Sequence, residues 1–204
     1  MGSGTCQLSN YLAIGTNNQI CAFDTSLKSL TLGKEFANKN DIKNIQFIRG
    51  DVFDEIFEKE SFDFVLSNGV LHHTKNPAKA FSNIASYLKK DGYILVGLYN
   101  KIGRARTILR KYLFKIFGKN LLLKLDPVLR KFKNTSEDKI QAWIRDQYLH
   151  PLESTHTFDE VLEWFKLNNI EFINSVPECS LFGSPVSNLF EKGIKSTLLE
   201  RLFQ

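Results

Sequence analysis

The stretch FDFVLSNGVLHHTKNPAKAF, residues 62–81, places a strand, a polar turn and a helix in direct succession. Phe62 to Leu66 is a short apolar run that predicts a strand, and the chain turns at Ser67-Asn-Gly69. Asn76 and Pro77 supply an N-cap and a first-turn proline for a helix. The apolar positions of that helix share one face, namely Ala80, Phe81, Ile84, Ala85 and Leu88. This order of elements is typical of α/β proteins.

The same alternation of strand and helix extends in both directions from this stretch. Upstream, strands are predicted at residues 19–24 and 45–48, with a helix over 26–39 between them. Downstream, residues 93–99 form an almost continuously apolar run, of the kind found in strands that are covered on both faces. Because strands alternate with helices, we expect an α/β fold with a mostly parallel sheet and flanking helices.

The pattern changes to helices after Asn100. Helical spacing predicts three helices, over residues 102–117, 121–132 and 137–148. A capping box at Thr157-Phe-Asp-Glu160 opens a further helix, and residues 170–176 are predicted as a returning strand. We therefore expect three regions: an α/β core at 1–100, a basic helical insertion or lid at 101–156, and a C-terminal helix-strand-helix segment at 157–204 that completes the core.

Basic residues are concentrated in one part of the chain. Residues 101–134 carry eleven lysines and arginines against Asp126 alone, a local balance of +10, whereas the whole chain carries +5. Such a block suits an anionic substrate, a lipid surface or nucleic acid. The amphipathic stretch 102–117 within it can pack on its own domain with solvated lysines, cover an anionic substrate, or lie at a lipid interface.

Composition excludes several classes of protein. The apolar fraction of 43% is enough for a buried core. No run of eighteen uncharged apolar residues and no secretory signal pattern occurs, so we expect a soluble cytoplasmic protein. The three cysteines, Cys6, Cys21 and Cys179, lack C-x-x-C spacing, which argues against a disulfide framework or a zinc ribbon.

Ligand-type residues stand at the predicted ends of successive strands. Ligands of parallel sheets bind at the carboxyl ends of strands. Gly2 and Gly4 open a loop before the first helix, Asp24 follows a strand about 20 residues later, and Asp51 and Asn68 end the next two. Each has a structural alternative: a lone glycine pair is weak evidence, Asp24 can cap a helix, and Asp51 can form an acidic turn. Their order along the chain favours a ligand site.

These segments together resemble the class I S-adenosylmethionine-dependent methyltransferases, especially a small-molecule branch with a VLHH…P segment. The resemblance covers Gly2 to Tyr99 and rests on GSGTCQLS, AFD, RGDVFD, the stretch 62–81 and LKKDGYILVGLY. It implies a Rossmann-like fold and S-adenosylmethionine as cofactor. It also implies that Gly2 and Gly4 lie against the methionine part, that Asp24 holds the ribose, that Asp51 and Val52 flank the adenine, and that Asn68 and Val70 line the cleft near the sulfonium.

Two departures from the family pattern affect these expectations. Cys6 stands where a third glycine is usual, which makes the turn more crowded. The family's first strand and its terminal acidic residue are absent, so we expect a fragment truncated inside the glycine-rich motif, with two strand edges exposed. An expression-tag scar, MGSG, is the competing interpretation. The C-terminus lacks a clear closing strand, so its completeness is open.

Histidines supply the candidate groups for chemistry. Methyl transfer from a sulfonium is a direct displacement, so the protein aligns the reactants and deprotonates the acceptor where needed, without a metal. His72 and His73 are candidate catalytic residues; alternatively, one packs under the following helix and the other is solvated. A second segment offers three candidate substrate contacts on a lid, Tyr148, His150 and His156, or else forms a purely structural loop. A metal set of His150, Glu153 and His156 has weak support because the segment is irregular.

The sequence therefore predicts a methyltransferase that acts on a small-molecule or lipid-like acceptor of unknown identity. The alternative is an inactive fragment or scaffold that binds an anionic partner through residues 101–134. A nicotinamide-dependent oxidoreductase is disfavoured because Gln7 stands where a dinucleotide-binding turn has glycine. Methylation of DNA bases is disfavoured because Ser67-Asn-Gly-Val70 replaces the usual Asn/Asp-Pro-Pro-aromatic signature, and no specific nucleic-acid partner is predicted. The sequence does not predict the oligomeric state.

Overall fold

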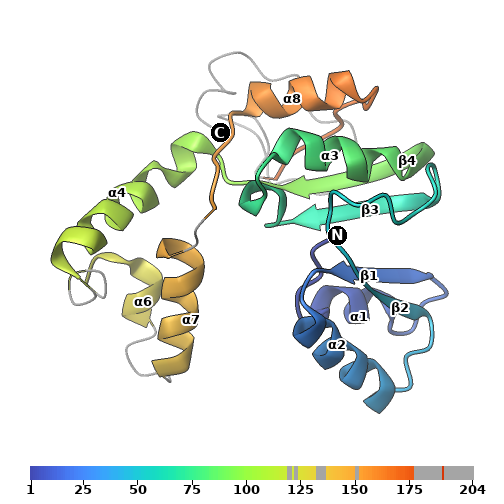
Figure 1. Cartoon of the computed structure of the whole chain (residues 1–204), viewed down its shortest axis with the longest axis horizontal. Helices are drawn as coiled ribbons and strands as arrows, with labels where there is room; N and C mark the ends of the chain where they lie inside the picture. Colours follow the sequence, from blue (N-terminus) through green and yellow to red (C-terminus); the bar gives the residue numbers. More distant parts are fainter. Residues whose placement is uncertain (119–120, 122–123, 132–136, 150–151, 177–189, 191–204) are drawn as a thin grey trace. The chain divides into compact units, whose positions relative to one another are not determined.

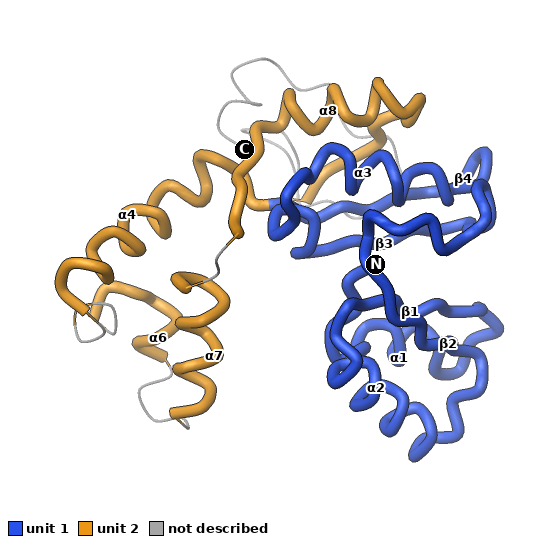
Figure 2. Tube along the Cα trace, in the orientation of Figure 1, with its two compact units in different colours: residues 1–98 blue, residues 99–204 orange. Residues whose placement is uncertain are grey.

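The chain divides into two compact units, Met1–Leu98 (unit 1) and Tyr99–Gln204 (unit 2) (Figure 2). The structure is a computed structural model that describes residues 1–118, 121, 124–131, 137–149, 152–176 and 190. Among these residues, no helix is both long enough and apolar enough to cross a bilayer.

Unit 1 alternates helices and strands, as predicted (Figure 1). Its elements in chain order are α1 (Gln7–Ala13), β1 (Ile20–Asp24), α2 (Leu27–Lys39), β2 (Ile45–Arg49), β3 (Phe62–Asn68), the 3₁₀ turn η1 (Leu71–His73), α3 (Pro77–Ser86) and β4 (Leu88–Gly97). The α/β class and the flanking helices predicted from the sequence are therefore confirmed.

The strands of unit 1 pair in parallel but form two sheets of two strands each within the described residues. β1 pairs with β2 from Ile20–Ile45 to Asp24–Arg49. β3 pairs with β4 up to Asn68–Gly97, with an irregular register near its start. Parallel pairing agrees with the sequence prediction, whereas a continuous sheet does not form between β1 and β3.

Side-chain packing holds each half of unit 1. Around β1 and β2, the core contains Cys6, Ala22 and Leu30, with Ile45 and Phe47 packed against it. A side chain on Gly33 of α2 would collide with Cys6, so the bulk of Cys6 is accommodated by the glycine opposite it. The two halves meet at Phe57, whose ring contacts Phe23 and Phe62 edge-on, with ring centroids 5.7 and 5.1 Å apart.

Helix α3 ends earlier than its apolar pattern predicts. The N-terminal prediction is confirmed, because Asn76 accepts a hydrogen bond from the Lys79 amide at 3.0 Å and Pro77 is the first residue. Leu88, however, begins β4 and does not belong to the helix. The reason is that the Tyr87 carbonyl already accepts hydrogen bonds from the Ser61 and Phe62 amides at the start of β3, which draws the chain into the strand.

The regular elements described in unit 2 are helices, joined by non-helical segments, two of which meet in a single parallel bridge between Asn100 and His156. Its helices are α4 (Lys101–Phe117), α6 (Pro127–Lys131), α7 (Glu137–Tyr148) and α8 (Phe158–Leu167). Leu129, Ile140, Ile144 and Tyr148 form its buried cluster, with Phe114 and Trp143 packed against it. The helix predicted over 121–132 lies partly outside the described residues, and Pro127–Lys131 of it is helical.

The predicted returning strand at residues 170–176 is wrong. The chain leaves α8 at Asn169, which has a left-handed φ of 56°. The Phe172 ring then packs against Phe158 and Phe165 of α8, with centroids 5.3 and 6.3 Å apart. The segment therefore packs on α8 through Phe172, and its residues 170–176 form no strand.

Candidate functional site

The N-terminal loop lies between the two sheets of unit 1. The Met1 amino group donates a hydrogen bond to the Leu66 carbonyl of β3 at 2.7 Å. The Ser3 amide donates to the Phe23 carbonyl of β1 at 2.9 Å. The loop is thus attached to the carboxyl-terminal halves of both strands, which is where ligands of parallel sheets bind.

Glycine is required in this loop for two reasons. Gly2 and Gly4 have φ values of 69° and 52°, in the left-handed region that side chains disfavour. A Cβ on Gly2 would also collide with both methyl groups of Val70. The structure therefore brings Gly2 and Val70 together, two residues that the sequence predicts at the cofactor, and leaves no room there for a side chain.

Asp24 connects the loop to the end of β1. Its Oδ2 accepts a hydrogen bond from the Gly4 amide at 2.7 Å, and its Oδ1 accepts from the Ser26 amide at 2.8 Å. Ser26, not Asp24, is the N-cap of α2, because its hydroxyl accepts from the Ser29 amide. Each carboxylate oxygen has a second lone pair, so Asp24 retains acceptor capacity for two ribose hydroxyls.

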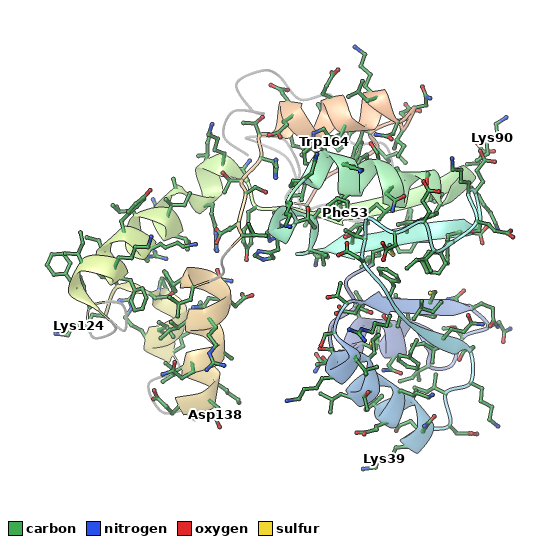
Figure 3. All side chains as sticks on the ribbon, viewed as in Figure 1. Lys39, Phe53, Lys90, Lys124, Asp138 and Trp164 are labelled. Carbon is green, nitrogen blue, oxygen red and sulfur yellow. The ribbon has the colours of Figure 1, made fainter. Side chains whose placement is uncertain are left out.

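Asp51 and Val52 begin a tight loop after β2. Asp51 is exposed, and its Oδ1 accepts a hydrogen bond from the Phe53 amide at 3.0 Å. This bond forms the acidic turn that the sequence offers as the alternative to a ligand contact. Phe53, the next residue after Val52, is labelled among the side chains in Figure 3. The turn does not use the whole Asp51 carboxylate, so the predicted contact with a ligand stays a prediction.

Helix α3 fixes this loop through side chains that the sequence analysis did not identify. Asn83 donates hydrogen bonds to the carbonyls of Val52 and Asp54, and the Tyr87 hydroxyl donates to the Asp54 carbonyl at 3.0 Å. The only sequence signal is an asparagine in a helix interior, where this residue is a poor helix former. Its use here is to position residues 52–54.

The end of β3 meets the end of β4 at a glycine. A Cβ on Gly97 would collide with the Asn68 amide oxygen, so Gly97 leaves the space that the Asn68 side chain occupies. Gly69 has a φ of 76° and donates a backbone hydrogen bond to the Gly97 carbonyl at 3.0 Å. Asn68 and Val70, both predicted near the sulfonium, thus lie on a turn whose course is set by two glycines.

His72 and His73 follow directly in the 3₁₀ turn η1. His72 is 1% exposed, whereas His73 is half-buried. Their ring centroids are 4.2 Å apart, so the two imidazoles are in contact. The turn begins at Val70, whose carbonyl accepts from the His73 amide at 2.9 Å. Both histidines therefore lie one turn from Val70, and their catalytic role stays a prediction.

In unit 2, Tyr148 is a buried residue of the packing between α6 and α7. It is 1% exposed, and its hydroxyl donates a hydrogen bond to Asp126. Burial is the main cause that raises the pKa of Tyr148 to about 12, and the Asp126 carboxylate is the second. Burial disfavours ionised Asp126, but hydrogen bonds from Tyr148, Trp143 and two backbone amides outweigh this and lower its pKa. These contacts give Tyr148 a structural role.

His156 is held on both ring nitrogens. Its Nδ1 lies 2.9 Å from Glu160 Oε1, and its Nε2 lies 2.8 Å from Ser154 Oγ. The ring also contacts Trp164 edge-on at 4.9 Å, and the backbone pairs with Asn100. His150, the third predicted substrate contact, lies outside the described residues.

Arg104 is a further residue that the sequence analysis did not single out. Its side chain is 8% exposed, and its Nε donates to Glu153 Oε1 at 2.8 Å. Its guanidinium lies over the Tyr99 ring at 3.9 Å and also donates to Gln147. Lys111 completes the group, at 3.4 Å from Glu153 Oε2. Burial disfavours the ionised form of Glu153, but the charges and hydrogen bonds of Arg104 and Lys111 outweigh burial and lower the pKa of Glu153.

Glu153 therefore has cationic partners, and a metal would have to compete with them. Its oxygens face Arg104 and Lys111, and His156 is engaged by Ser154 and Glu160. Across the residues that the structure describes, no group of three or more metal-ligating side chains is found. His150, the remaining residue of the metal set considered from the sequence, lies outside the described residues, so that set as a whole is not tested.

The fold is that of an α/β protein whose N-terminal loop is attached at the ends of parallel strands. The chain belongs to the Methyltransf_31 family, described as a methyltransferase domain, which its residues 1–166 match. An uncharacterized protein of Synechococcus is 22% identical over 194 residues, covering 84% of this chain and 46% of that protein. The uncharacterized methyltransferase YcgJ of Bacillus subtilis is 29% identical over 77 residues, or 37% of this chain and 30% of that protein.

Solved structures agree with this fold assignment. The structure of PKMT2 from Rickettsia typhi in complex with AdoHcy aligns with this chain with a TM-score of 0.65 and 19% sequence identity. The alignment covers 82% of this chain and 37% of the PKMT2 chain. The crystal structure of YcgJ has a TM-score of 0.52 and 20% identity and covers 82% of this chain and 58% of that chain. The match to this chain spans less than half the length of each of these two curated relatives.

Proposed function

We propose that unit 1 binds S-adenosylmethionine and that the protein transfers its methyl group to a small-molecule or lipid-like acceptor. The observation that carries this proposal is the hydrogen bond of 2.7 Å between the Gly4 amide and Asp24 Oδ2. It joins two elements of the family motif at one strand end, beside the contact of Gly2 with Val70. Membership of the methyltransferase domain family supports it.

The residues of unit 1 suit the parts of this cofactor. Gly2 and Gly4 present bare backbone, and a side chain on Gly2 would fill the space beside Val70. Asp24 keeps lone pairs for the ribose hydroxyls. Asp51 and Val52 are assigned to the adenine, and Asn68 to the methionine end. The bound cofactor supplies an electrophilic methyl group on a sulfonium.

The histidines are proposed to manage the proton of the acceptor. His73 is half-buried and can exchange protons with solvent, so we assign it the role of general base. His72 is buried against it, with ring centroids 4.2 Å apart, and is assigned the role of fixing the His73 ring. In unit 2, His156 and His150 are proposed as substrate contacts. Tyr148, the third substrate residue predicted from the sequence, is buried with its hydroxyl bonded to Asp126, so we propose a packing role within unit 2 for it instead.

We also propose that a strand between β1 and β3 joins the two sheets of unit 1 into one. Its support is that residues 1–3 already donate hydrogen bonds to Leu66 of β3 and to Phe23 of β1. Phe57 contacts rings from both halves, so the two edges belong to one packed body. Such a strand would satisfy the free edges and stiffen the loop at Gly2 and Gly4.

Calorimetric titration with S-adenosylhomocysteine tests the proposal. The chain is compared with a form extended upstream by an apolar strand that ends in an acidic residue. We expect the extended form to bind S-adenosylhomocysteine. Asp24→Ala in that form should lower the affinity at least about tenfold, because it removes the acceptor of the two ribose hydroxyls. Gly2→Ala in the extended form should also lower affinity, because its Cβ would collide with Val70, and Gly15→Ala is its control, since Gly15 has a similarly left-handed φ of 67° and open space around it.

The rival function is a scaffold without catalytic activity that binds an anionic partner through residues 101–134. Its support is the charge of that block, +10, in a chain with +5 overall. If both forms are folded and neither binds S-adenosylhomocysteine, the methyltransferase proposal fails and the scaffold becomes the better hypothesis.

A further inference from the structure

Helix α4 has the opposite distribution of side chains from an ordinary surface helix. Along α4, every residue of which the structure describes, Arg104 is the one buried side chain. Large apolar side chains are exposed instead: Ile102 by 49%, Leu109 by 60%, Tyr112 by 62%, Ile116 by 72% and Phe117 by 61%. A surface helix normally buries its apolar stripe and exposes its charges.

Four of these exposed side chains, Ile102, Leu109, Tyr112 and Ile116, lie on one side of the helix, and we call them the apolar stripe of α4. Ile102, Leu109 and Ile116 recur every seven residues and so follow one line along the helix. Tyr112 lies three residues after Leu109 and four before Ile116, on the same side. The 17-residue helix is about 26 Å long, so the stripe is several side chains in extent.

The packed side of α4 is accounted for by contacts within unit 2. Arg104 and Lys111 pair with Glu153, and Phe114 packs against the cluster that contains Tyr148. These residues lie on the side of the helix away from the apolar stripe, as their positions in the helical repeat require. The polar network therefore fixes the helix in the orientation that turns its apolar side chains to solvent.

Charge identifies the occupant of this stripe. Lys101 and Arg106 are exposed, and Arg106 lies between Ile102 and Leu109 at helical spacing. No acidic residue occurs from Tyr93 to Leu125. A second copy of this helix would bring cations against cations, which disfavours self-association. An anionic lipid surface matches both features, since it takes up apolar side chains and attracts the cations beside them.

We propose that α4 is a membrane-surface helix, whose apolar stripe inserts into the headgroup region of anionic lipid while Lys101 and Arg106, which flank the stripe, contact the headgroups. The helix lies in the plane of the membrane surface and does not cross it. This proposal does not depend on the methyltransferase assignment, because it rests on unit 2 alone. It supplies a means to hold a protein of this family beside lipid.

Vesicle flotation of the full chain tests this proposal. Vesicles of phosphatidylcholine are compared with vesicles that also contain phosphatidylglycerol, at low and high salt. We expect preference for the anionic vesicles, with a loss of about fivefold for each flanking cation removed, as in Arg106→Gln at low salt. Ile116→Glu is expected to lower partitioning more than about tenfold, because it places a charge in the stripe.

Leu167→Glu is the matched control. Leu167 is 72% exposed, as Ile116 is, but it belongs to α8. It should leave vesicle binding unchanged, and both variants should keep the wild-type circular dichroism because neither side chain is buried. Insertion is measured with Tyr112→Trp, whose fluorescence brominated lipids should quench on binding.

Several results would overturn the proposal. One is a wild-type chain that shows no preference for anionic vesicles, and another is equal loss in Ile116→Glu and Leu167→Glu. Binding without quenching of Tyr112→Trp would reduce the contact to adsorption through charge. A self-associated form in sedimentation velocity that Ile116→Glu dissociates would mean that the stripe binds a second copy of the chain. Binding of an RNA oligonucleotide that displaces the vesicles and is unaffected by Ile116→Glu would mean that the partner is nucleic acid. None of these results depends on cofactor binding, which the titration with S-adenosylhomocysteine measures separately.

Discussion

Helices α3 and α4 have the same sequence pattern but bury opposite sides. Both are amphipathic, and both begin at an asparagine cap. Helix α3 buries Ala80, Phe81 and Ile84, whereas α4 buries Arg104 and exposes its apolar stripe. The comparison teaches that periodicity predicts a helix, while the partner surface decides which side of the helix is covered.

The partner surfaces differ in kind. Helix α3 packs beside β4 and the turn η1, which present apolar side chains such as Leu71. Helix α4 packs beside α7, which presents the Gln147 side chain to Arg104, and the segment after it presents Glu153. An apolar surface takes up the apolar side of a helix, and a carboxylate in a buried position requires a cation.

The largest expected effect tests the apolar sides of the two helices. Phe81→Ala removes a fully buried ring from α3 and should lower the free energy of unfolding by about 3–5 kcal/mol. Leu109→Ala removes an exposed side chain from α4 and should change it by no more than about 0.5 kcal/mol. Urea denaturation measures both. Comparable losses in the two variants would mean that the apolar stripe of α4 is covered within the protein.

The next effect tests the buried charge of α4. Arg104→Met leaves Glu153 buried with Lys111 as its remaining cationic neighbour, and should cost about 3 kcal/mol in unit 2. Glu153→Gln combined with Arg104→Met should recover part of this loss, because no unpaired carboxylate then remains. Lys115→Met, at an exposed position of the same helix, is the control. Denaturation followed by tryptophan fluorescence reports on unit 2, since Trp143 and Trp164 both lie there. An unchanged midpoint for Arg104→Met would show that the ion pair does not hold α4.

Acidification provides a third test, of the buried carboxyl groups in unit 2. The pKa values of Asp126 and Glu153 are lowered from ordinary values of 3.8 and 4.5. Ionisation is favoured in the folded state, so the stabilisation is present above the ordinary values and is lost as pH falls through the lowered ones. We expect unit 2 to lose stability below about pH 4.5, in the range where these carboxyls titrate. Thermal unfolding of the wild type and of Glu153→Gln across this range should show a weaker pH dependence in the variant. Parallel curves would exclude Glu153 as a source of the pH dependence.

The part of the site that sequence reasoning predicted is the part governed by backbone chemistry. Gly4 and Asp24 are joined by a hydrogen bond at a strand end, and Gly2 approaches Val70 so closely that only glycine fits there. Their spacing is a local property of the chain, so a single sequence contains it. The same holds for Asn76 and Pro77 at the start of α3.

Residues whose role depends on distant partners were not predicted. Glu153 was weighed as a metal ligand, but its partner Arg104 is 49 residues away in the sequence. Asn83 fixes Val52 across 31 residues, and Phe172 turns the predicted strand at 170–176 back onto α8. Spacing rules describe neighbours within one element, and nothing in them specifies which elements pack together.

The smallest expected effect separates local helix formation from tertiary packing. Asn76 accepts one amide hydrogen bond at the start of α3, from Lys79, and Asn100 accepts two at the start of α4, from Ile102 and Gly103. Replacement of either cap by alanine should cost about 1 kcal/mol in urea denaturation, because each leaves helix amides without their acceptor. Asn76→Asp and Asn100→Asp should keep most of the stability, since aspartate caps equally well. Similar losses at the two caps would mean that α3 and α4 begin by the same local physics and differ only in what covers them. A much larger loss at Asn100 would instead place the cap within the packing of unit 2, where the Asn100 backbone pairs with His156.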